Sequence, residues 1–160
     1  MLAVFVVFWS WVFLFASKEA VNRIDDRAWA ERAEARCLQA TEARYELINL
    51  TRIDQATPEL IRQRADIVDQ STTILEQMLA DIVAVQPFDE KGQAIVPQWE
   101  ADYRIYLEDR RTYARQLRES GENLPFYETA TDGIPISERI ATFAGDNEMS
   151  ECAPPLDLTR

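Results

Sequence analysis

The chain has 160 residues and a formal net charge of −11, with 28 acidic and 17 basic side chains. We therefore expect no nucleic-acid partner, because phosphate binding requires clustered Lys and Arg. There is no histidine, which removes the commonest general base and most zinc and di-iron patterns. We accordingly predict a protein that is not an enzyme and has no catalytic residues, metal site or cofactor.

Residues 2–16, LAVFVVFWSWVFLFA, contain no charge and one polar side chain, Ser10. As a helix this run spans about 24 Å, which is short against a hydrocarbon core of about 30 Å but sufficient if its ends lie at the interface. A cleaved signal peptide is the main alternative, but Leu14 and Lys18 stand where cleavage requires a small residue. A buried helix of a soluble core is the third interpretation. We predict a transmembrane anchor over residues 1–17, in the bilayer of the cell membrane.

Small residues recur along one side of this predicted anchor. Ala3, Ser10 and Ser17 are spaced seven residues apart. Small side chains in line allow a second transmembrane helix to approach closely. We predict that these three residues form a packing surface for another membrane helix; the alternative is a generic anchor with chance spacing.

The next segment contains neither proline nor glycine, and its charges alternate in sign, so we predict one continuous helix over residues 18–53. Asp25 and Asp26 are interpreted as part of its solvated face, because adjacent helical residues point about 100° apart. Apolar residues at near-heptad spacing define one side of this helix: Val21, Ile24, Ala28, Ala35, Leu38 and Tyr45. Small residues define a second, narrower side: Ala30, Ala33, Cys37 and Ala40.

The two cysteines, Cys37 and Cys152, are too far apart in sequence for a CxxC motif. An even count beside a membrane segment predicts a disulfide, and hence an oxidising compartment. The alternative is two separate buried thiols. Lys18, Arg23 and Arg27 favour the opposite orientation under the positive-inside rule, but long domains translocate largely regardless of charge. We predict a single-pass protein with an extracytoplasmic C-terminal domain.

A second helix is predicted over residues 58–85, with Thr57 as its N-cap and Pro58 at its first position. Its apolar stripe has clear helical periodicity. The members of the stripe are Ile61, Ala65, Val68, Thr72, Leu75, Met78, Leu79 and Ile82. Pro87 and Gly92 then indicate a loop.

A third helix is predicted over residues 97–120 and ends before Gly121. One face carries a row of large residues, which we call the aromatic row: Trp99, Tyr103, Tyr106, Arg110 and Tyr113. Such a row can belong to the core with its hydroxyls reaching water, form a docking face, or line a ligand groove. Arg110 is predicted to extend to solvent at the edge of the row; if buried, it requires a carboxylate or carbonyl partner.

Residues 122–160 form an acidic, proline-containing segment with a Thr-Asp-Gly turn and a short predicted helix over residues 136–144, which stops at Gly145. The remainder has little apolar content and would be disordered if free. A disulfide at Cys152 would tie it along the first helix.

The predicted fold is all-α: a transmembrane helix continuing into an antiparallel bundle of three to four helices over residues 18–121, followed by the irregular segment. We expect a structural or accessory subunit that binds other membrane or envelope proteins, or a second copy of itself. The alternative is a ligand-binding or sensory domain, with the aromatic row as a groove for a small anion or aromatic molecule. In layout the chain is similar to extracytoplasmic sensor domains of bacterial receptors, although it has no second apolar segment.

Overall fold

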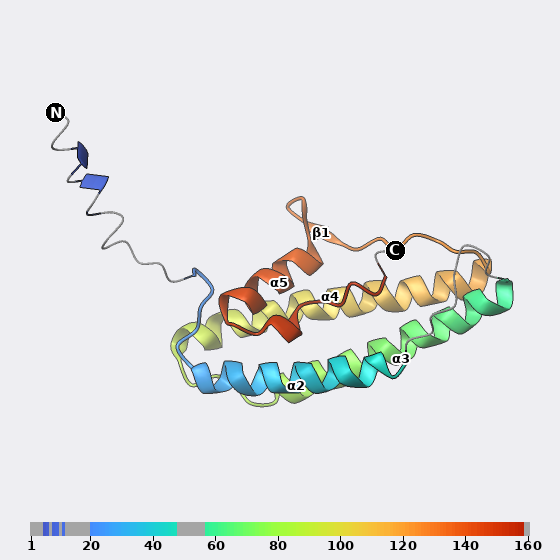
Figure 1. The fold of residues 1–160 in the computed structure, drawn as a ribbon, viewed down its shortest axis with the longest axis horizontal. Coiled ribbons are helices and arrows are strands. Elements are labelled where there is room, and N and C mark those ends of the chain that lie inside the picture. The colour runs from blue at the N-terminus through green and yellow to red at the C-terminus, as the bar shows by residue number, and fades with distance from the viewer. Residues whose placement is uncertain (1–4, 7, 10, 12–19, 48–56, 159–160) are drawn as a thin grey trace.

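A computed structural model describes residues 5, 6, 8, 9, 11, 20–47 and 57–158. Three long helices lie side by side and alternate in direction, and the C-terminal segment covers one side of them (Figure 1). These helices are α2 (Arg27–Tyr45), α3 (Pro58–Val83) and α4 (Glu90–Ser120). The predicted all-α bundle is therefore confirmed for the described residues.

The first bundle helix begins later than predicted. Residues 20–26 are not helical, and α2 starts at Arg27 because Asp26 is its N-cap: the backbone N–H of Trp29 donates to Asp26 Oδ1 over 2.9 Å. The preceding backbone is bonded elsewhere, since the N–H of Ile24 donates to Asn147 Oδ1 over 2.9 Å. The prediction of one helix continuous with the anchor is wrong at this point, as is the solvated position predicted for Asp26, which is buried.

Of the two predicted sides of α2, the narrow one is buried. The narrow side of small residues, around Cys37, is buried against α3 and the C-terminal segment. Most of the broader heptad side faces solvent; its exposed members on α2 are Ala28, Ala35, Leu38 and Tyr45. Small side chains allow the close approach of helices that this packing requires, which explains why the less hydrophobic side is the buried one.

Helix α3 follows the prediction closely. The hydroxyl of Thr57 accepts from the N–H of Leu60, Pro58 occupies the first turn, and the helix ends at Val83, two residues before the predicted end. All eight members of the predicted apolar stripe are buried. Periodicity and capping agree here, so the local sequence determines both the ends and the orientation of this helix.

Helix α4 begins at Glu90, seven residues before the predicted start. Asp89 is the N-cap, and its Oδ1 accepts from the N–H of Gly92 over 2.7 Å. Pro97 lies inside the helix on an exposed position, where its missing N–H removes one internal hydrogen bond. The predicted C-terminal cap is confirmed: Gly121 has a left-handed conformation, with φ of 66°.

The chain then returns along the bundle in an extended segment. A small antiparallel hairpin pairs β1 (Ala130–Thr131) with β2 (Ile134–Pro135), and the predicted Thr-Asp-Gly turn lies at its tip. Helix α5 (Ile136–Asp146) follows and continues through Gly145, which was predicted to end it. A short 3-10 helix, η2 (Ser150–Cys152), which was not predicted, brings Cys152 to α2.

The predicted anchor is largely outside these elements. Among the described residues, no helix combines the length and the apolar character needed to cross a bilayer. Ala3, Ser10 and Ser17 lie outside the described residues.

Candidate functional site

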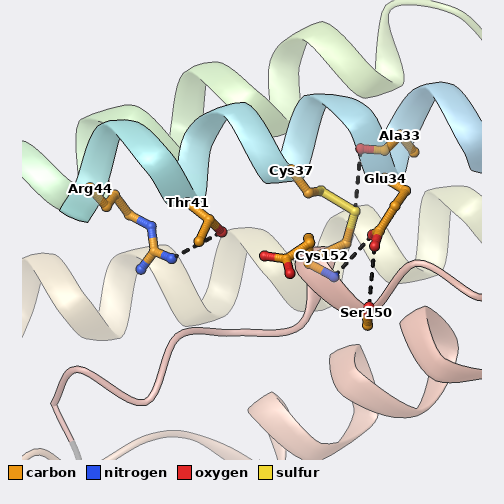
Figure 2. Close-up of a disulfide and its surroundings, with 8 residues drawn as sticks. Ala33, Glu34, Cys37, Thr41, Arg44, Ser150 and Cys152 are labelled. Atoms are coloured by element: carbon orange, nitrogen blue, oxygen red, sulfur yellow. Dashed lines mark hydrogen bonds between the residues drawn. A yellow bond between two sulfur atoms is a disulfide. The ribbon is translucent and has the colours of Figure 1, made fainter. Parts of the chain in front are cut away.

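The predicted disulfide joins Cys37 of α2 to Cys152 of η2 (Figure 2). Both half-cystines are fully buried, and their Cα atoms are 5.1 Å apart. Glu34, one turn before Cys37, reinforces the link: its Oε2 accepts from the backbone N–H of Glu151 over 2.9 Å, and its Oε1 accepts from the hydroxyl of Ser150 over 3.2 Å. The small side of α2 therefore binds the chain's own C-terminal segment.

All five members of the aromatic row are buried, and the chain's own residues cover them. The ring of Phe126 packs between Tyr106 and Tyr113, with centroid distances of 6.1 and 5.5 Å. The hydroxyl of Tyr113 donates to the carbonyl of Leu124 over 3.0 Å, and that of Tyr106 donates to the carbonyl of Pro155 over 3.2 Å. The occupant of this predicted docking face is thus the segment from residue 121 to residue 158.

The other end of the aromatic row joins three helices. The indole of Trp99 lies 6.4 Å from the ring of Trp29 on α2 and 5.4 Å from those of Tyr103 and of Phe143 on α5. Among the described residues, Trp99 Nε1 and the Tyr103 hydroxyl have no hydrogen-bond partner. Burial raises the pKa of Tyr103, so its phenol is protonated at every physiological pH.

Arg110 lies at the centre of the row and is fully buried, so the prediction that it extends to solvent is wrong. Its NH1 and NH2 groups form a bidentate pair with Asp157 Oδ1 and Oδ2, at 2.7 and 2.9 Å. Nε donates to the Thr72 hydroxyl and NH2 to that of Ser71, each over 3.1 Å, and NH1 donates to Tyr106 Oη over 3.4 Å. We call Arg110, Asp157, Ser71, Thr72 and Tyr106 the arginine clasp.

The arginine clasp uses the whole donor capacity of the guanidinium. Burial lowers the pKa of Arg110, but the hydrogen bonds and negative charge of Asp157 raise that pKa by more. The net shift is upward, so the guanidinium is permanently charged. Five N–H groups meet five acceptors, which leaves no donor for an anionic ligand. The arginine clasp therefore binds the C-terminal segment to α3 and α4.

A charged network on the surface connects the same two helices. Arg111 pairs with Asp69 and Glu76, and Arg118 pairs with Asp66 and Asp69. Partial burial raises the pKa of Asp69, but hydrogen bonds from the two arginines lower it by more, so the net shift is downward. The network therefore stabilises the folded state most when this carboxyl is ionised.

Asp157 is the residue of the clasp that sequence reasoning missed. It lies in a segment with little apolar content and belongs to no local pattern. One signal could have found it: a buried Arg110 requires a carboxylate, and a disulfide at Cys152 places residue 157 within a few residues of a fixed point.

The chain matches no protein family, no curated protein and no solved structure. In the described ranges, no group of three metal-ligating side chains is suited to hold an ion.

Proposed function

We propose that the chain is a single-pass membrane protein whose disulfide-braced helical bundle is displayed on the extracytoplasmic side and binds other membrane or envelope proteins. Its role is that of a structural or accessory subunit. The bundle provides a rigid body, and the exposed side of α2 provides the contact surface.

The outward side of α2 is the observation that carries this proposal. Leu38 and Tyr45 are 45% and 66% exposed, and they are one heptad apart, as are the exposed Ala28 and Ala35. On one helix these positions form two adjacent rows, which is the pattern that a partner helix packs against. The other long helices direct their apolar stripes into the core. The apolar rows on α2 are therefore the bundle's helical surface best suited to a partner.

Two further features support the location. A disulfide between Cys37 and Cys152 favours an oxidising compartment. The apolar segment 2–16 precedes the bundle, and its described residues are helical with exposed side chains, as lipid contact requires: Phe5, Val6, Phe8, Trp9 and Trp11.

The small-molecule alternative receives less support. A ligand groove at the aromatic row requires residues 121–158 to leave that face. The disulfide and the bidentate pair between Arg110 and Asp157 both oppose this movement.

The test is purification of the full chain from native membranes in mild detergent, followed by measurement of the mass of the complex and identification of its components. We expect the wild type to copurify with a stoichiometric partner and the double variant L38E/Y45E to lose it. The matched control is I105E, which adds a charge at an exposed apolar position of α4 (38% exposed) and should retain the partner. A lone monomeric wild type, or a double variant that retains its partner, would refute the proposal; a complex made only of this chain would identify a second copy as the partner.

A further inference from the structure

The loop between α3 and α4 exposes two large apolar side chains at one end of the bundle. Val85 is 55% exposed and Phe88 is 75% exposed. Ala84 and Gln86 are exposed as well, Pro87 is buried, and no residue from 84 to 88 carries a charge. In water this arrangement is unfavourable, because large apolar side chains gain free energy from burial. We call residues 84–88 the apolar tip.

Hydrogen bonds to the start of α2 hold the apolar tip in place. The N–H of Phe88 donates to Asp26 Oδ2 over 3.1 Å, and the N–H of Asp26 donates to Asp89 Oδ2 over 3.2 Å. The indole N–H of Trp29 donates to the carbonyl of Val85 over 2.6 Å. The main chains of Val85 and Phe88 are therefore both fixed by hydrogen bonds, while their side chains are exposed.

This end of the bundle is also the end at which the chain arrives from the apolar segment 2–16. Only four residue steps separate Ala16 from Ala20, a distance of at most about 14 Å. Residues 20–26 then reach the start of α2 beside the loop, as Figure 1 shows at the left end of the bundle. If the segment spans a bilayer, the apolar tip consequently lies at the end of the bundle that is attached to it, since Asp26, ten residue steps after Ala16, bonds the N–H of Phe88.

We propose that the apolar tip is a second membrane contact, in which Val85 and Phe88 enter the boundary between the headgroups and acyl chains of the same bilayer. The inference rests on the proposed membrane anchoring and names a surface that this anchoring does not require. Apolar and aromatic side chains on an otherwise polar body are the chemistry that enters this boundary. The absence of charge from residues 84–88 assigns the contact to zwitterionic lipid, which has no net charge. With two points of attachment, the bundle is held in one orientation to the membrane.

The test is photocrosslinking of the full chain, one copy per phosphatidylcholine nanodisc, with p-benzoylphenylalanine in place of Phe88 or, in a second variant, of Val85. The matched control carries the same group at Tyr127, which is aromatic and 79% exposed. Its neighbour Thr129 is bonded to Asp109, about 30 Å along α4 from Asp89. Lipid adducts are counted by mass spectrometry, and circular dichroism verifies that each variant is folded.

We expect at least a fivefold higher yield of lipid adducts from positions 85 and 88 than from position 127. Equal yields at the three positions would overturn the inference. Flotation of the chain with vesicles at alkaline pH, with and without residues 2–16, tests the anchoring separately. A chain that floats through residues 2–16 but gives no lipid adducts at the tip would refute only the second contact, whereas a chain that fails to float would refute both.

Discussion

The arginine clasp predicts a large and specific effect of replacing Asp157 by Asn. The substitution keeps the size of the side chain but removes its charge, and it turns an N–H donor toward the guanidinium of Arg110. That guanidinium is fully buried and cannot be rehydrated without opening the C-terminal segment. The variant therefore retains a buried cation whose counter-ion has been lost.

The magnitude follows from the burial of the pair. Breaking a buried ion pair by removing one partner costs about 3–5 kcal/mol. The Asp157 side chain is 38% exposed, so water offsets part of this loss, and we expect a decrease of about 2–3 kcal/mol in the free energy of unfolding. The double variant R110M/D157N carries no buried cation, and Thr72 keeps its bond to the carbonyl of Val68. We expect it to be about 1 kcal/mol more stable than D157N.

The assay is urea unfolding of the full chain in a mild non-ionic detergent, followed by far-ultraviolet circular dichroism. With a slope of about 2 kcal/mol per molar urea, the expected loss lowers the midpoint by about 1–1.5 M. The matched control is E122Q, which removes the same charge from an exposed side chain and should be neutral. A D157N midpoint equal to that of the control, or a double variant less stable than D157N, would contradict the reasoning.

Three further predictions concern stability in the same assay. Replacing Cys37 and Cys152 together by Ala should lower the free energy of unfolding by at most about 5 kcal/mol, because the bridge closes a sequence separation of 115 residues, and limited proteolysis should then cut near the C-terminus. The substitution D26A should lower the free energy of unfolding by about 2 kcal/mol, since both carboxylate oxygens accept backbone N–H groups. The control D25A, at the exposed neighbouring position, should change it little. Similar values for the two variants would contradict the capping role. The unfolding free energy should be constant between about pH 6 and 8, because the chain has no histidine. It should fall as the pH drops through and below 3.8, the unfolded-state pKa of Asp69, because the folded-state pKa is lower and protons bind the unfolded state first. A flat profile down to pH 2 would exclude this linkage.

Much of the fold is predictable where local signals agree. Thr57, Pro58 and the apolar stripe of α3 determine one helix, and Gly121 ends another. The start of α2 is different: its cap, Asp26, bonds the nearby Trp29, but the contacts that hold Asp26 and the chain before it in place are distant in sequence. Asp26 and Asp89 accept from backbone groups of each other's segments, and no pattern within either segment reveals that pairing.

The candidate site was predictable in its members on α4 but not in what covers them. The spacing of the aromatic row follows from helical periodicity, and so does its common face. Its burial depends on Phe126 and Asp157, whose segments have weak periodicity, and the disulfide holds the chain close to Asp157. The choice between the two sides of α2 likewise depends on helix-to-helix distance, which favours small residues over the more hydrophobic Leu38 and Tyr45.

The disulfide also decides how mechanical force passes through the molecule. A pull applied between a point before Cys37 and a point after Cys152 runs along the first part of α2, crosses the sulfur–sulfur bond and continues along the residues that follow Cys152. Tension cannot extend the chain between the two cysteines, which includes all of α3, α4 and α5. A load applied before Cys37 and after Cys152 would thus leave most of the core unstretched, and reduction of a single covalent bond would expose that core to the full pull.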